Sequence, residues 1–147
     1  MSTNIMNSEL PKFVRQGVEP LYPKVLYNRP ITRAAGGSLL IIGGYSGEFV
    51  LPTGVYHLSM AAGAGECRVA LPTSLAKIVG DAPGVAYVAA SPSGSLGSEA
   101  LGRLLELSED ADAISIGASL SNNSHTAILL ERLLTCAPTY REIASAH

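Results

Sequence analysis

Residues Ser38–Gly44, with the sequence SLLIIGG, give the clearest indication of the fold. They form a short continuous apolar run that two glycines end, which is typical of a β-strand buried on both faces of its sheet. Three later stretches repeat this character: Cys67–Leu71 (CRVAL), Val85–Ala90 (VAYVAA) and Ala113–Gly117 (AISIG). The four runs predict four strands of one sheet.

Helical patterns lie between these runs. A first helix is predicted over about Leu51–Ala62, where the glycines of Gly63–Gly65 end it. A short second helix is predicted to be capped by Thr73 or Ser74 and to end at Gly80.

Two further helices follow the third and fourth runs. The fourth helix is expected to be capped within Ser121–Ser124 and to stop at Pro138. The apolar faces of the two helices are formed by Leu96, Ala100, Leu101, Leu104 and Leu105, and by Ala127, Ile128, Leu130, Leu133 and Leu134. Strands that alternate with helices imply right-handed βαβ units. The predicted fold class is therefore α/β, a mostly parallel sheet with helices on both faces.

Composition supports a folded domain. The 147 residues are 47% hydrophobic and 15% charged, which supplies a core and excludes a wholly disordered chain. The net charge is −2, and no basic stripe interleaved with aromatic residues occurs, so a nucleic-acid binder is not expected. No apolar run reaches the ~18 residues of a membrane helix. The first residues also lack the pattern of a signal peptide.

The chain is predicted to consist of an irregular arm over residues 1–33 and an α/β domain over residues 34–147. The arm is rich in proline and net basic, and one short helical piece is expected near Lys12–Gln16. Its basic residues suit either a solvated tail or a site for an anionic ligand. Cys67 and Cys136 form no CxxC motif, and we interpret them as reduced cysteines of a cytoplasmic protein.

A parallel sheet of this kind binds ligands beyond the carboxyl ends of its strands, so the loops there are the candidate sites. The first loop is Gly43-Gly44-Tyr45-Ser46-Gly47, between a strand and a helix. Its glycines allow a close approach of backbone N–H groups, and the helix behind them favours negative charge. A tight turn without a ligand is the alternative.

The second loop is Gly117–Ser124, whose hydroxyls and amides could contact a polar ligand or could only cap the next helix. Ser46 and Ser119 have no identifiable base partner, so the sequence predicts no catalytic residue.

The three histidines predict no metal site, because none has ligand spacing with Cys, Asp or Glu. His57 lies in the middle of a predicted helix, His125 in the first turn of another, and His147 is the last residue. The acidic cluster Glu109-Asp110-Asp112 is interpreted as a solvated turn.

In their order, these loops resemble the ADP/ATP-dependent NAD(P)H-hydrate dehydratase family of the ribokinase-like superfamily. That family has an H-K-G-x-x-G motif followed by an apolar strand that ends in Gly-Gly, which Gly37 and Ser38–Gly44 match. The segment Gly63-Ala64-Gly65 before a strand also matches, and Asp112–Gly117 with the downstream Thr126 resembles the family's later strand and threonine.

Three motifs depart from the family pattern. Its His-Lys-Gly triplet is Thr32-Arg33-Ala34 here, its Gly-Ala-Pro is Val50-Leu51-Pro52, and its G-P-G-L-G is Gly117-Ala118-Ser119-Leu120-Ser121. Members of the family are nearly twice as long, and their G-T-G-D motif with the acid/base Asp lies after the point where this chain stops.

The resemblance implies the first half of a ribokinase-like fold and a substrate- or nucleotide-binding side without the catalytic Asp, inactive alone. ADP or ATP is the cofactor it implies. The implied binding residues are Arg33, facing a phosphate, with Gly37, Gly43, Gly44, Tyr45, Ser46, Gly47, Gly117 and Ser119.

Two other interpretations stay open. The chain could be a non-catalytic interaction subunit that assembles through an exposed sheet edge, as a homo-oligomer or with a partner chain. It could also be a fragment of a complete dehydratase, which would be a lyase.

Overall fold

The computed structural model describes Val18 and residues 30–136 of the chain. The fold is that of the unit that begins at Ile31. The predicted helical piece near Lys12–Gln16, the helix stop at Pro138 and His147 lie outside the described residues.

The described fold is a four-stranded sheet in which every neighbouring pair of strands is parallel. In space the strands follow the order β3-β2-β1-β4. Their bounds are β1 Ser38–Gly43, β2 Glu66–Pro72, β3 Val85–Val88 and β4 Ala113–Ala118. All four predicted runs are strands, and the predicted α/β class is confirmed.

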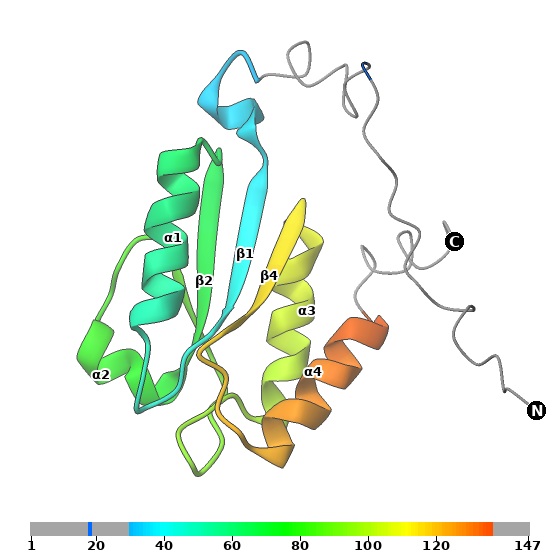
Figure 1. Ribbon diagram of the computed structural model, residues 1–147. Helices are drawn as coiled ribbons and strands as arrows, with labels where there is room; N and C mark the ends of the chain where they lie inside the picture. Colours follow the sequence, from blue (N-terminus) through cyan, green and yellow to red (C-terminus); the bar gives the residue numbers. More distant parts are fainter. Residues whose placement is uncertain (1–17, 19–29, 137–147) are drawn as a thin grey trace, which may run out of the picture. The chain divides into compact units, whose positions relative to one another are not determined.

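Helices cover both faces of the sheet (Figure 1). The chain moves outward from β1 to β3 and then crosses back to β4, so the helices before and after this crossover pack on opposite faces. On one face lie α1 (Val50–Ala62), the 3-10 turn η2 (Thr73–Leu75) and α2 (Ala76–Val79). On the other lie η3 (Ser98–Ala100), α3 (Leu101–Glu109) and α4 (Ser124–Cys136). A further 3-10 turn, η1 (Arg33–Gly36), precedes β1.

Alternation along β1 divides the core in two. Leu40 and Ile42 pack under α3 and α4, whereas Ile41 packs under α1 and α2. Successive side chains of a strand point to opposite faces, so a continuous apolar run supplies both cores at once. This is the physical reason why SLLIIGG specifies a central strand.

Two predicted helix starts are wrong. Thr73 and Ser74 cap no helix, because they lie within η2 and the Ser74 hydroxyl donates to the carbonyl of Gly94 instead (2.8 Å). Leu96 lies before η3 and forms a bridge with Ala90, although it is buried as the pattern required. Ser74 and Leu96 both fit a helical pattern in the sequence, but in the fold they contact the 90–97 loop instead: Ser74 bonds to Gly94, and Leu96 pairs with Ala90.

The other helix limits agree with the sequence. Gly63 ends α1 in the left-handed conformation, and Gly80 follows the last residue of α2. Asn123, within the predicted segment, caps α4 through its Oδ1, which accepts from the N–H of His125 (2.9 Å). No helix among the described residues is long and apolar enough to span a membrane.

The acidic cluster is more than the predicted solvated turn. The Asp112 carboxylate accepts from the Ser38 N–H (2.8 Å) and the Ser38 hydroxyl (3.0 Å), which joins the start of β4 to the start of β1. These hydrogen bonds to the ionised form hold the pKa of Asp112 below its usual value. Asp110 forms an ion pair with Arg68 (3.3 Å). Local sequence contains no sign of partners more than forty residues away.

Candidate functional site

The two predicted loops meet at the carboxyl edge of the sheet, where β1 and β4 end side by side. The Gly44 N–H donates to the carbonyl of Ala118 (2.9 Å), and a Cβ on Gly43 would overlap that same oxygen. At this reversal of strand order, diverging loops leave a crevice in doubly wound proteins. Here the backbones of the two loops are in direct contact, so they leave no crevice between Gly43–Gly44 and Ala118.

The rest of the glycine loop is also closed upon itself. Tyr45 and Glu48 exchange two backbone hydrogen bonds of 2.9 Å, and the Ser46 N–H donates to the carbonyl of Gly94 (3.0 Å). Gly47 leaves no room for a Cβ because the ring of Tyr45 lies over it. The loop is therefore a tight turn, pinned to the neighbouring loop that follows β3.

The start of α1 already holds an anionic group. One carboxylate oxygen of Glu48 accepts from the N–H groups of Val50 (2.6 Å) and Leu51 (3.2 Å). These are donors that a bound phosphate would use, and Pro52, next in the helix, has no N–H. The chain thus supplies its own acceptor at the helix terminus where the sequence suggested a ligand.

Arg33 and Gly37 lie at the opposite edge of the sheet from the glycine loop. The six residues of β1 separate them from it, which corresponds to about 20 Å of extended chain. The Arg33 guanidinium donates to the carbonyl of Met60 at the end of α1 (3.4 Å), and the Gly37 carbonyl accepts from the N–H groups of Gly65 and Glu66. The nine predicted binding residues are therefore divided between two edges.

Ser119 is the most unusual residue at the carboxyl edge. It is the one non-glycine residue with a positive φ (56°) in the described part of the chain, and Gly117 beside it also has a positive φ (121°). The Ser119 hydroxyl is buried, and the described residues offer it no hydrogen-bond partner. Backbone strain and an unsatisfied polar group both concentrate at functional sites, and here they coincide in one residue.

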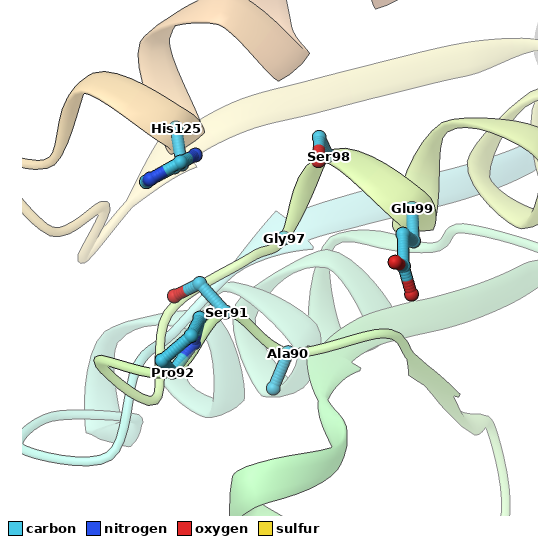
Figure 2. A pocket seen from close by; sticks show the side chains of 7 residues that line it. All are labelled: Ala90, Ser91, Pro92, Gly97, Ser98, Glu99 and His125. Carbon is cyan, nitrogen blue, oxygen red and sulfur yellow. The ribbon is translucent and has the colours of Figure 1, made fainter.

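A pocket opens at the same edge of the sheet, beyond β3 and at the start of two helices (Figure 2). Its volume is about 390 Å³, within the range typical of small-molecule sites. Three segments form it: the loop after β3, the first turn leading into α3, and the first turn of α4. The lining residues are Ala90, Ser91, Pro92, Gly97, Ser98, Glu99 and His125. None of the nine residues predicted to bind a ligand lines it.

A network of hydroxyl groups fixes the wall of this pocket. The Ser91 hydroxyl bonds to those of Ser93 (2.9 Å) and Ser95 (2.8 Å). The Asn123 amide donates to Ser93 (2.7 Å), and the Thr126 hydroxyl donates to the carbonyl of Leu96 (3.2 Å). Asn123 and Thr126 belong to the start of α4, so the network ties the serine loop to the helix that carries His125.

The loop after β3 follows a predicted strand, so the fold class alone predicts that it lies at this edge of the sheet, but the sequence pattern assigns it no role. The sequence does contain a signal: in the stretch SPSGSLGS three serines alternate with Pro92, Gly94 and Leu96, and a fourth follows Gly97. His125 was placed correctly in the first turn of a helix, but its approach to the serine loop depends on the order of the strands.

Comparison with known proteins identifies no relative: no protein-family model, no curated protein and no solved structure matches the chain. Within residues 30–136 no group of three or more His, Cys, Asp or Glu side chains is arranged to hold a metal ion. Cys67 is buried, which raises the pKa of its thiol, whereas Cys136 is exposed; both are free.

Proposed function

We propose that the chain binds a small polar ligand of the nucleotide class in the pocket formed by Ser91, Ser98, Glu99 and His125, as a non-catalytic relative of the NAD(P)H-hydrate dehydratases. The observation that carries this proposal is the position of the pocket. It lies beyond the carboxyl ends of parallel strands, which is where doubly wound sheets bind their ligands. The strained Ser119 at the same edge supports a role in binding.

The pocket residues offer groups that match the parts of a nucleotide. A carboxylate such as that of Glu99 accepts hydrogen bonds from the vicinal hydroxyls of a ribose. The N–H groups of Ser98 and Glu99, at the start of the helical segment, have no acceptor within the part of the chain that is described. Together with the His125 imidazole and the Ser98 hydroxyl, they can donate to phosphate oxygens.

Binding fits this site better than catalysis. No hydrogen bond joins a serine hydroxyl to a histidine ring in residues 30–136, and the Ser91 hydroxyl is bonded to other serines. A nucleophilic serine requires an adjacent base, which this arrangement does not provide.

Calorimetric titration of the purified full chain with ADP, ATP and NADH tests the proposal. We expect saturable binding of at least one of them, with a Kd between about 10 μM and 1 mM, the range of modest small-ligand affinity. Glu99→Ala and His125→Ala should each weaken this binding at least about fivefold, which corresponds to the loss of one hydrogen bond to a charged group. Glu131→Ala, on the exposed surface of α4, and His57→Ala, on α1, are the matched controls and should bind as the unaltered chain does.

Two results would overturn the proposal. One is the absence of saturable binding of all three nucleotides at about 10 mM, a concentration that detects even very weak ligands. The other is binding that neither Glu99→Ala nor His125→Ala weakens, because the ligand would then occupy another part of the molecule.

A further inference from the structure

The outer surface of α1 has no Asp, Glu, Lys or Arg, and large apolar side chains are exposed on it beside Thr53 and His57. From Phe49 to Gly65 the sequence contains no Asp, Glu, Lys or Arg. Three large apolar residues of α1 are nevertheless exposed, Val50 by 70%, Leu51 by 58% and Leu58 by 72%. A helix that is apolar on its outer as well as its inner surface is normally covered on both.

The apolar surface continues beyond α1 on the same face of the sheet. Ile78 of α2 is 63% exposed. Beside it a hollow of about 310 Å³ opens, and most of its lining is apolar. It is lined by Thr53, Tyr56, His57, Val69, Leu71, Val79, Ala82, Pro83 and Val85. We refer to the exposed surface of α1, η2 and α2, with this hollow, as the α1–α2 face.

Other outer surfaces of the described fold differ from this one. The edge strand β4 exposes only the small residues Ala113 and Gly117. The outer surfaces of α3 and α4 are charged, with Arg103 and Glu106 paired at 2.8 Å on α3. Burial of apolar area is the main driving force of association, so the α1–α2 face gains more from being covered than the β4 edge does.

We infer that the α1–α2 face is the interface of a homodimer. A twofold interface must be complementary to itself, because the same patch of both copies forms it. This face has both components: the side chains of Leu51, Leu58 and Ile78 protrude from its helices, and the apolar hollow elsewhere on the face can receive such a side chain from the second copy. All residues of α1, η2 and α2 except the buried Pro52 and Leu75 are at least partly exposed, and together with those lining the hollow they approach the 20–30 residues a side of a standard interface.

The absence of charged residues on α1 favours a second copy of the chain over other binding partners. A charged protein surface would lose its hydration against α1 and find no opposite charge there. An anionic membrane or a nucleic acid would need lysines or arginines that Phe49–Gly65 lacks. The charges next to the hollow, Lys77 on α2 and Asp81 after it, have opposite signs, so two copies of this face do not repel each other.

Light scattering after size-exclusion chromatography of the full chain tests the dimer. At about 100 μM, a concentration that populates even micromolar complexes, we expect twice the mass of one chain. Leu58→Glu should weaken dimerisation at least about tenfold, because it would bury an unpaired charge. Ile128→Glu is the matched control: Ile128 is 51% exposed on α4, outside this face, and its replacement should leave the dimer intact. Leu58 is exposed, so neither variant threatens folding, which circular dichroism verifies.

A second measurement locates the interface. With Cys136 replaced by Ser, a Leu58→Cys variant should react with maleimide at least about fivefold more slowly above the dimerisation midpoint than below it, since only free chains expose the thiol. An Ile128→Cys variant should react equally fast at both concentrations. A monomeric mass at all concentrations overturns the inference. A dimer that Leu58→Glu leaves intact, and in which the thiol of the Leu58→Cys variant stays reactive, overturns it as well.

Discussion

The two helix layers of this protein have similar interiors and different exteriors. Each layer packs on one face of the same sheet, α1 and α2 over Ile41 and α3 and α4 over Leu40 and Ile42. On the outside, α3 and α4 carry five charged residues: Arg103, Glu106, Glu109, Glu131 and Arg132. The other layer carries one, Lys77 of α2, and exposes large apolar side chains.

The difference separates two demands on a helix. Folding requires only the inner face of a helix to be apolar, and both layers meet that demand. A lone domain in water also needs a largely polar outer face, and the charged residues of α3 and α4 bring that layer closer to this demand, although Ile128 and Leu134 of α4 are exposed. The layer that contributes to the pocket at Ser91 and His125 therefore also has the more highly charged outer surface. We assign association to the α1–α2 face.

The largest expected effect tests whether the interiors are in fact equivalent. Leu104→Ala, in the α3–α4 layer, and Leu75→Ala, in the α1–α2 layer, should each lower the free energy of unfolding by about 2–5 kcal/mol, because both side chains are fully buried. Urea denaturation of the two variants at equal protein concentration measures both losses. If Leu75→Ala cost less than about 1 kcal/mol, the typical loss for an ordinary substitution, the two layers would differ inside as well as outside.

The sequence predicted the fold well for a local physical reason. The central strand β1 is a continuous apolar run, buried from Leu40 to Gly43, so no alternative period competes with the assignment there. The other three strands are mostly apolar and are bounded by glycines or polar turns, which is enough to mark them as strands. The two errors, the caps at Thr73 or Ser74 and the inclusion of Leu96 in a helix, both involve the 90–97 loop. Hydrogen bonds between this loop and residues far away in the sequence, such as Ser46 and Ser74, determine the conformation of these segments, and a local sequence pattern cannot predict such bonds.

The candidate site was only partly predictable. The fold class predicts that the candidate loops lie at the carboxyl edge of the sheet, where the structure has them. The sequence also predicts Ser119 as a binding residue, but its positive φ and unpartnered hydroxyl follow only from the structure. Whether a glycine loop is open or closed depends on what lies opposite. Gly43 and Gly44 touch Ala118, more than seventy residues away in the sequence. The pocket at Ser91 and His125 depends in the same way on which strands are neighbours.

The helix caps provide an intermediate test of the comparison between the layers. Asn123→Ala should lower the free energy of unfolding by about 1–2 kcal/mol, because Asn123 caps α4 and also donates to Ser93. Glu48→Ala should cost about 0.5–1 kcal/mol, because the Glu48 carboxylate only caps α1. Thermal or urea unfolding compares the two variants. A larger loss for Glu48→Ala would show that the start of α1, and not the network behind the pocket, is the more important anchor of the carboxyl edge.

The smallest effect concerns the amino edge of the sheet, where the hydrogen bonds between Asp112 and Ser38 join β4 to β1. Both helix layers pack on this sheet, so the test applies to both. Because hydrogen bonds from Ser38 lower the pKa of Asp112 in the folded state, its stabilising contribution is fully present above its unfolded pKa of about 3.9. The contribution is lost as the pH falls through the lower folded pKa. Asp112→Asn should therefore be less stable than the unaltered chain at pH 6, and the difference should shrink as the pH falls below about 4, the usual pKa of an Asp side chain. Urea unfolding of both proteins between pH 2 and pH 7 measures this difference, with Asp81→Asn, in the turn after α2, as the control. A difference that stays constant over this pH range would show that the geometry of the turn, and not the charge of Asp112, holds the two strands together.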